Sequence, residues 1–258
     1  PERLAVEVAA GLRDAVASRL PGVRVLTGWV DVLTPHVTDV LAGLAEAVVV
    51  PAFLTAGYHV TTDLPEAIES RSHAVLTPHV GPRLLDAVAG RLLEAGGPGD
   101  AVVLAAAGSL RPGSVAEVEA AADALAARFG VPVRPGFLYA AAPSVAAAVS
   151  GLLEEGFADV SIAPYVIAPG LFEERLHGLG AARVAAPVGV HPLLVDAVVA
   201  EYRAAFRAGD VPAYLSGLDL AGRRVLVAGA GRVATRRIAG LLEAGADVVA
   251  VAPSASCA

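Results

Sequence analysis

The sequence predicts an α/β fold: two similar, doubly wound lobes with parallel sheets, followed by an incomplete βαβ unit at the C-terminus. Short apolar runs alternate with Ala- and Leu-rich helical stretches along all 258 residues. Segments of the first half recur in the same order in the second half. We expect lobes at residues 1–97 and 98–208, a linker at 209–222 and the βαβ unit at 223–258.

The expected strands are short apolar runs bounded by turn residues. They fall at residues 23–30, 47–53, 74–76, 101–106, 131–137, 160–166 and 182–188. Amphipathic stretches between them predict helices at residues 35–46, 83–95, 114–129 and 143–155. Ser114, with Glu117 three positions later, predicts a capping box at the start of helix 114–129. Helices between consecutive strands imply parallel sheets that are covered on both faces.

An internal repeat supports two homologous halves. Residues 48–57 match 161–170, residues 29–35 match 137–143, and residues 77–81 match 186–189 more weakly. The second half opens with strand 101–106 and the turn Ala107-Gly108-Ser109, whereas the first half begins directly in the helix that matches 114–129. We therefore expect the first strand and turn of the first half to lie upstream of Pro1.

Composition narrows the function classes. No apolar run reaches the roughly 18–20 residues that span a bilayer, so no membrane segment is expected. A net charge of −7, without a basic patch, argues against a nucleic-acid partner. The single Cys257 excludes an internal disulfide and fits the cytoplasm. All nineteen basic residues are Arg, whose planar fork suits a polycarboxylate ligand.

The loop at residues 51–65 holds the strongest candidate for chemistry, His59. It follows a parallel strand, where open α/β sheets place their ligands. The repeat matches His59 with Phe172, and Asp31, at the end of the preceding strand, with Tyr139. One half thus holds ionisable groups where the other holds aromatic rings. A duplication with one working half explains this difference, and so does drift around a bystander histidine.

The remaining polar residues of this region have structural interpretations. Asp63, followed by Glu66 three positions later, has the form of a helix N-cap, which we favour over a direct chemical role. His36, His73, His177 and His191 receive no role. His79 lies in a Pro/Gly loop and receives none either, although that loop is the one best placed to border a ligand site.

These patterns resemble a known family, the sirohydrochlorin chelatases. The first is Pro-x-Phe-Leu-x-x-Gly-x-His-x-x-x-Asp-Leu-Pro at residues 51–65. The second half carries the family's second pattern at Pro164, Tyr165, Pro169, Gly170 and Phe172. The resemblance covers residues 1–206 and implies two α/β lobes with the tetrapyrrole between them.

The resemblance implies catalytic roles for His59 and Asp31. His59 matches the family's loop histidine, and Asp31 stands where an acidic residue, usually Glu, is found. The family's early His-Gly-Ser turn falls before Pro1, and the second half has Ala107 in the equivalent turn. A neutral imidazole can bind Fe²⁺ or Co²⁺ and accept a proton near neutral pH, so His59 is also the expected metal ligand.

The C-terminal segment has the context of a dinucleotide-binding turn. Gly229, Gly231 and Ala234 follow a strand expected at 223–227 and open a helix expected at 232–244, with a second strand at 247–251. Such small residues let the backbone approach a pyrophosphate. Residues 225–253 resemble the start of precorrin-2 dehydrogenase, an NAD-dependent Rossmann enzyme. We expect NAD binding only if that module were complete.

We therefore expect a metal chelatase that inserts Fe²⁺ or Co²⁺ into sirohydrochlorin, for sirohaem or corrinoid synthesis. The dehydrogenase-like tail slightly favours iron. Two alternatives stay open. One is a cobaltochelatase of the cobalamin pathway. The other is a tetrapyrrole-binding or scaffolding protein without turnover. The protein should act on this small molecule in the cytoplasm, as a monomer or as a homodimer.

Overall fold

The computed structural model describes residues 2–69, 74–207, 224–228, 238, 241–242 and 246–251. The chain divides into two compact units, Pro1–Val211 and Pro212–Ala258. The first unit contains two parallel sheets and the second contains one parallel strand pair. The α/β class with parallel sheets, predicted from the alternating pattern, is confirmed.

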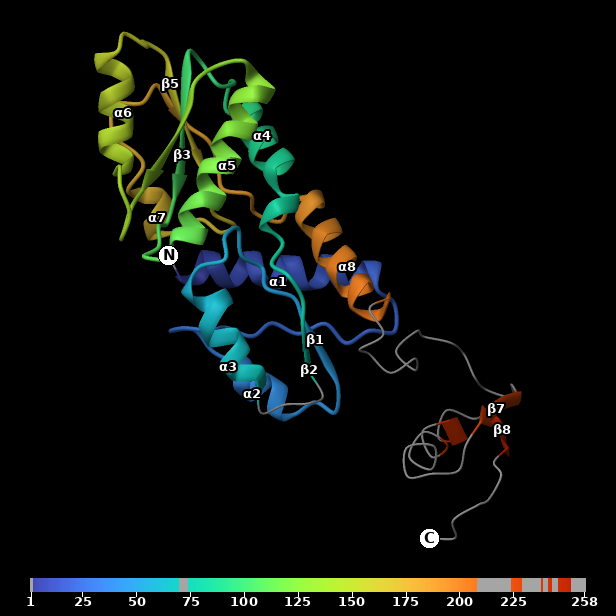
Figure 1. Ribbon diagram of the computed structural model, residues 1–258. Coiled ribbons are helices and arrows are strands. Elements are labelled where there is room, and N and C mark those ends of the chain that lie inside the picture. Colours follow the sequence, from blue (N-terminus) through green and yellow to red (C-terminus); the bar gives the residue numbers. More distant parts are fainter. Residues whose placement is uncertain are drawn as a thin grey trace. The chain divides into compact units, whose positions relative to one another are not determined.

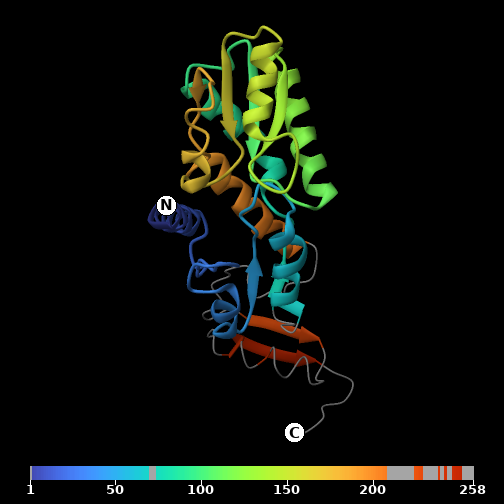
Figure 2. The same cartoon turned by 90° about the vertical axis from the view of Figure 1, so that its left-hand side faces the viewer.

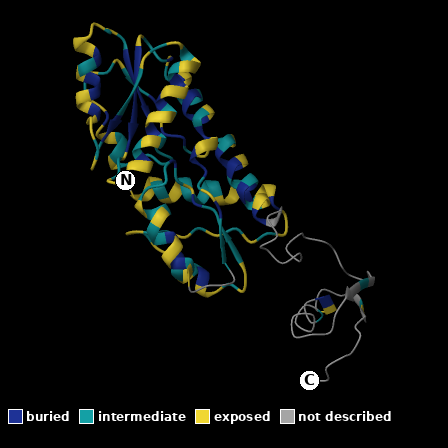
Figure 3. Cartoon of the chain, in the orientation of Figure 1, coloured by how far each residue is buried: buried dark blue, intermediate teal, exposed yellow. Residues whose placement is uncertain are grey.

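The larger sheet has the order β4-β3-β5-β6, with every neighbouring pair parallel. Its strands are β3 (Ala101–Ala106), β4 (Val133–Phe137), β5 (Val160–Pro164) and β6 (Arg183–Val184). All six side chains of β3 are at most 2% exposed, and they alternate between two hydrophobic clusters. Burial on both faces explains why β3 is a continuous apolar run. Figure 3 shows the central strands of this sheet, β3 and β5, in dark blue.

Helices cover both faces of the larger sheet. α6 (Val145–Glu154) packs on one face, and α4 (Leu85–Glu94) and α5 (Pro112–Phe129) pack on the other (Figure 1). The short helix α7 (Leu171–Glu174) follows β5. The predicted doubly wound arrangement is therefore confirmed for the second half. Strand 182–188 was predicted too long, because only two of its residues pair with β5.

The smaller sheet pairs β1 (Ala47–Val49) with β2 (Ala74–Leu76). Helices α2 (Val37–Ala42) and α3 (Leu64–Glu69) contribute buried side chains to the cluster that packs against it. The strand predicted at 23–30 is wrong: the segment forms a single bridge, between Trp29 and His36. Its residues still alternate between exposed and partly buried, as in a strand, but no described strand pairs with them.

The structure reproduces the internal repeat at one local feature. In the first half a parallel bridge joins Trp29 to His36, and in the second half an equivalent bridge joins Phe137 to Ser144. In each case the aromatic residue's N–H donates to the carbonyl of the proline that precedes the following helix, at 3.0 Å and 2.9 Å. Matching loops of the two halves thus adopt the same hydrogen-bond pattern.

The last helix of each half packs away from its own sheet. α4 follows β2 in sequence but packs on β5, and α8 (Pro192–Arg207) follows β6 but packs against α1 (Glu2–Arg19). Both views place α1 and α8 between the two sheets (Figures 1 and 2). A boundary near residue 97 therefore separates the strands of the two sheets, but helices from each half pack against the other half. The predicted domain limits stay a prediction. Within the described part of the chain, no helix is both long and apolar enough to cross a membrane.

The second unit holds the parallel strands β7 (Arg224–Ala228) and β8 (Asp247–Val251). The strand predicted at 247–251 is confirmed, and the one predicted at 223–227 begins one residue later. Residues 238, 241 and 242 are helical, within the helix expected at 232–244. The dinucleotide-binding candidates Gly229, Gly231 and Ala234 lie outside the described residues, as does the linker expected at 209–222.

Candidate functional site

His59 lies at the start of an unusual helical turn that follows β1. The segment η1 (His59–Asp63) is a π-helix, closed by the Leu64 N–H donating to the His59 carbonyl. It continues directly into α3. π-Helical turns are rare and are frequent at functional sites. The loop histidine therefore stands at the carboxyl end of a parallel strand, as predicted, but on a turn that the sequence pattern did not reveal.

The imidazole of His59 is paired with the carboxylate of Asp63. Nδ1 of His59 lies 2.6 Å from Oδ2 of Asp63, and the side chains are 40% and 29% exposed. An ionised carboxylate can only accept, so Nδ1–H donates and the lone pair of the neutral ring is left on Nε2. No described residue forms a hydrogen bond with Nε2. Metal-binding histidines commonly have this arrangement.

Asp63 corrects the interpretation drawn from the sequence. It was expected to cap a helix beginning after it, but the helical segment already begins at His59. Asp63 therefore lies inside that segment, where residues four apart share a face, and its side chain binds His59. The signal was present in the spacing His-x-x-x-Asp, which suits a side-chain pair as well as a cap.

Asp31 lies apart from this pair in the hydrogen-bond network. It is exposed, and within the described residues it forms no hydrogen bond or ion pair with His59. Its catalytic role stays a prediction. The described residues also contain no group of three or more His, Cys, Asp or Glu side chains that could hold a metal ion. Within the described residues, His59 is therefore not a member of a closed structural metal site of three or four such side chains.

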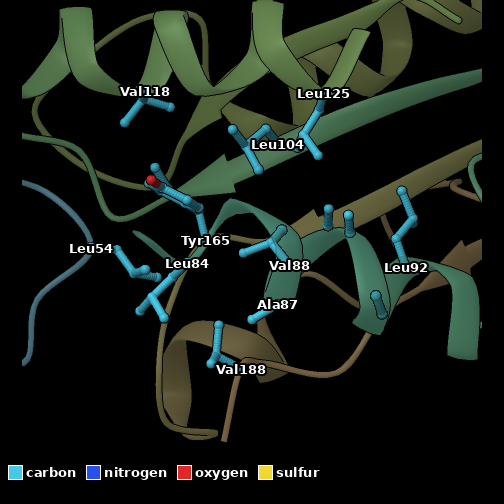
Figure 4. Close-up of a cluster of buried hydrophobic side chains, with 14 of the residues drawn as sticks. Leu54, Leu84, Ala87, Val88, Leu92, Leu104, Val118, Leu125, Tyr165 and Val188 are labelled. Carbon is cyan, nitrogen blue, oxygen red and sulfur yellow. The ribbon is translucent and has the colours of Figure 1, made fainter. Parts of the chain in front are cut away.

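The second half anchors the loop that carries His59. Leu54, 7% exposed, inserts into the hydrophobic cluster of the larger sheet beside Leu84 and Tyr165 (Figure 4). Two residues later, the Ala56 N–H donates to Oε2 of Glu117 on α5 at 2.7 Å. An apolar anchor and a charge-assisted hydrogen bond therefore fix the loop on the side that leads to His59.

Glu117 has a role that the capping-box prediction missed. α5 begins at Pro112, two residues before the expected start, and it has no side-chain cap. Glu117 is therefore free to reach the first half, where its Oε1 lies 3.5 Å from Nε2 of His79. The His79 side chain is only 10% exposed, and its Nδ1 lies 3.2 Å from both the Phe53 carbonyl and the Gly81 N–H. His79 thus holds the loop together.

Tyr165 is the buried ionisable group of this region. Its side chain points into the cluster around Leu104 and Val118 (Figure 4). Burial, with a smaller contribution from the negative charge of Glu117, raises the pKa of Tyr165 to about 12. The phenol is therefore neutral at physiological pH, and Tyr165 acts as part of the core.

The second-half counterparts of His59 and Asp31 contribute packing and a hydrogen bond. Phe172 packs against the hydrophobic cluster on the α6 face of the larger sheet. Tyr139 is 49% exposed, and its hydroxyl accepts a hydrogen bond from Arg175. The asymmetry predicted from the repeat therefore has a structural meaning, because Phe172 supports the fold at the position where the first half presents an imidazole.

Comparison with known proteins extends to most of the chain. Residues 2–95 and 101–205 match the family described as CbiX. SirB from Bacillus subtilis, solved with Fe³⁺, is similar with a TM-score of 0.64 and 24% identity, over 80% of this chain and 92% of that one. The sirohydrochlorin chelatase SirB from Bacillus subtilis subspecies spizizenii, in complex with cobalt, gives 0.60 and 21%, over 79% and 89%.

A third similar structure is that of CbiX, the terminal enzyme for biosynthesis of sirohaem in denitrifying bacteria, with a TM-score of 0.59 and 21% identity, over 78% of this chain and 91% of that one. The C-terminal residues 217–258 match an NAD(P)-binding family. Precorrin-2 dehydrogenase from Priestia megaterium is 59% identical over 39 residues, which are 15% of this chain and 19% of that protein. The chain thus spans about a fifth of the length of that relative.

Proposed function

The chain belongs to the CbiX family, and we propose that it inserts a divalent metal ion, Fe²⁺ or Co²⁺, into sirohydrochlorin. The observation that carries this proposal is the His59–Asp63 pair, with its free Nε2 on a π-helical turn. The proteins of similar fold support it, because they are SirB solved with Fe³⁺, a sirohydrochlorin chelatase SirB in complex with cobalt and the terminal enzyme of sirohaem biosynthesis in denitrifying bacteria.

Metal insertion requires two tasks that suit this pair. The incoming ion must exchange water for the ring nitrogens, and two pyrrole N–H protons must leave. Nε2 of His59 serves as a ligand to the arriving ion and, once the ion has passed to the ring, accepts the two pyrrole protons one after the other, releasing the first to solvent before it takes the second. Asp63 holds the ring through Nδ1 and stabilises the imidazolium that forms. A positioned acid–base group typically accelerates a reaction by about 10²- to 10⁴-fold. We propose Asp31 as an assisting group that relays protons to solvent.

Iron is the metal that we favour. The C-terminal similarity to precorrin-2 dehydrogenase supports sirohaem synthesis, in which iron is inserted. Ligand chemistry separates Fe²⁺ and Co²⁺ poorly, because they are neighbours in the affinity series. Comparing the insertion rates of the two ions at equal concentration tests this choice. A faster rate with Co²⁺ would place the protein in corrinoid synthesis.

The test of the function is the rate at which sirohydrochlorin absorbance converts to that of the metallated ring. We expect His59→Ala to lower this rate at least about tenfold. His177→Ala is the matched control, because His177 also pairs with a carboxylate four positions away, Glu173, at 3.7 Å. Equal rates for the two variants would refute the role of His59. Sirohydrochlorin binding without insertion would support the scaffolding alternative.

Asp63→Asn isolates the positioning role. The amide keeps the size of the carboxylate but loses its charge, so the hydrogen bond to Nδ1 weakens. Losses of about 10- to 100-fold in metal affinity or activity are typical when such a partner is changed. We expect insertion to slow by that amount while the thermal unfolding temperature changes little, because the pair is partly exposed. A wild-type rate would show that Asp63 does not position His59.

We extend the proposal to the surroundings of the reaction. The protein works in the cytoplasm and assembles as a homodimer, which sedimentation analysis tests. Gly229, Gly231 and Ala234 contribute to NAD binding only within a complete dehydrogenase module, in line with the short match to precorrin-2 dehydrogenase. No measurable NAD affinity is expected for residues 217–258 alone.

A further inference from the structure

An arginine of the second half lies against the turn that carries His59. Arg111 follows β3 and is the N-cap residue, directly before the first residue of α5. Its Nη2 donates to Oγ1 of Thr62 at 2.7 Å, and its Cζ lies 5.3 Å from the centroid of the Tyr58 ring. Tyr58 directly precedes His59, and Thr62 lies within η1. A cation from one half therefore contacts residues on both sides of the candidate metal ligand.

Among the described residues, no carboxylate lies within ion-pair distance of Arg111. Most other arginines of the described chain pair with Asp or Glu within 4.0 Å: Arg3, Arg13, Arg19, Arg83, Arg91, Arg128, Arg134 and Arg183. Arg111 forms no such pair with a described residue, and it is exposed. The side-chain hydrogen bond from Arg111 to Thr62 uses one of five guanidinium donors. The others remain available to an anionic ligand.

The second half contains a matching arrangement. Nη1 of Arg175 donates to the Tyr139 hydroxyl at 2.5 Å, and its Cζ lies 5.3 Å from the Tyr139 ring centroid. Arg175 also has no carboxylate partner among the described residues. Because β3 pairs in parallel with both β4 and β5, the segments that follow these three strands begin at the same end of the sheet. They contain Arg111, Tyr139 and, at the end of α7, Arg175. Two guanidinium groups, each beside a tyrosine and without a carboxylate partner among the described residues, thus lie at the carboxyl end of the strands, where α/β folds bind ligands.

We propose that Arg111 and Arg175 bind peripheral carboxylates of the tetrapyrrole. The proposal rests on the proposed function, since it takes a polycarboxylate macrocycle as the ligand. Contact with a tyrosine ring and one hydrogen bond hold each guanidinium in place without neutralising its charge, so each group is positioned before an anion arrives. Arg111 thereby holds a carboxylate beside His59, which positions the ring for metal transfer. Arg175 holds another carboxylate on the second half.

Measuring the binding of sirohydrochlorin through the quenching of its fluorescence tests the proposal without requiring turnover. We expect Arg111→Gln and Arg175→Gln each to raise the Kd about tenfold, as expected for the loss of a charge-assisted hydrogen bond. Arg128→Gln is the matched control, because Arg128 also lies near an aromatic ring, Phe129, but is neutralised by Asp86. The methyl ester of sirohydrochlorin, which lacks the charges, should bind all the proteins equally weakly.

The outcomes separate this proposal from the proposed function. Arg-dependent binding without metal insertion would support the carboxylate sites and contradict the chelatase activity. Insertion with an unchanged Kd in both variants would do the reverse. Arg111→Lys gives a second check, because it keeps the charge but loses the planar fork, so its Kd should lie between those of Arg111→Gln and the wild type. Equal Kd values for Arg111→Gln and Arg128→Gln would overturn the proposal, provided that both variants unfold at the wild-type temperature.

Discussion

Raising the pH should destabilise the protein through Tyr165. The folded state holds the phenol neutral, because burial and the Glu117 charge raise its pKa to about 12, whereas the ordinary pKa of a tyrosine, as in the unfolded chain, is 10.0. The unfolded chain therefore loses this proton first. The stabilisation is fully present below about pH 10 and is lost as the pH rises toward 12. With about 1.4 kcal/mol per pKa unit, the loss by pH 12 amounts to about 2 kcal/mol.

The assay is urea unfolding of the wild type and of Tyr165→Phe between about pH 9 and pH 12. Removing the hydroxyl removes the titration but keeps the ring, and no described residue hydrogen-bonds to that hydroxyl. Other tyrosines titrate in both proteins, so the difference between the two curves isolates Tyr165. We expect the variant to become about 2 kcal/mol more stable relative to the wild type over this range. Parallel curves would refute the assignment of the raised pKa to this buried phenol.

Two further predictions concern the framework. Gly136→Ala should destabilise the protein by about 1–3 kcal/mol, because a Cβ there would lie 2.8 Å from the backbone Cα of Val145. Its control, Gly113→Ala, meets nothing within 4 Å and should be neutral or slightly stabilising. Equal urea-unfolding midpoints for the two variants would contradict this prediction. Leu104→Ala, at a side chain with 0% exposure, should cost about 2–5 kcal/mol in urea unfolding. A loss well under 1 kcal/mol would mean that the sheet face is not packed as described.

The second half was the easier one to predict, for a physical reason. Strand β3 is buried on both faces, so its sequence is an uninterrupted apolar run whose limits coincide with the predicted 101–106. Residues 23–30 carry the alternating exposure of a strand, but pairing depends on a neighbour, which local sequence does not encode. Strand β8 was predicted as the second strand of the βαβ pattern, and its limits agree at 247–251.

The candidate site, too, was predictable from the sequence only in part. The position of His59 after a strand followed from the local pattern, and the structure agrees. Its partner Asp63 was misinterpreted because spacing alone does not distinguish a cap from a pair one π-turn apart. Glu117 binds the backbone of a residue 61 positions away, and Arg111 binds a side chain 49 positions away. Contacts of that range leave no periodic signal, so sequence reasoning assigned Glu117 to a cap and gave Arg111 no role.

Metal delivery to sirohydrochlorin requires the ion to reach Nε2 of His59, and paramagnetic NMR measures this directly. Co²⁺ broadens the imidazole signals of a histidine that binds it, so titration should broaden the His59 signals well before those of His177. Asp63→Asn should shift that broadening to higher Co²⁺ concentrations, because the carboxylate orients the ring. If the His59 signals stay sharp at Co²⁺ concentrations that support insertion into sirohydrochlorin, the imidazole does not deliver the metal, and the proposed role of His59 is refuted.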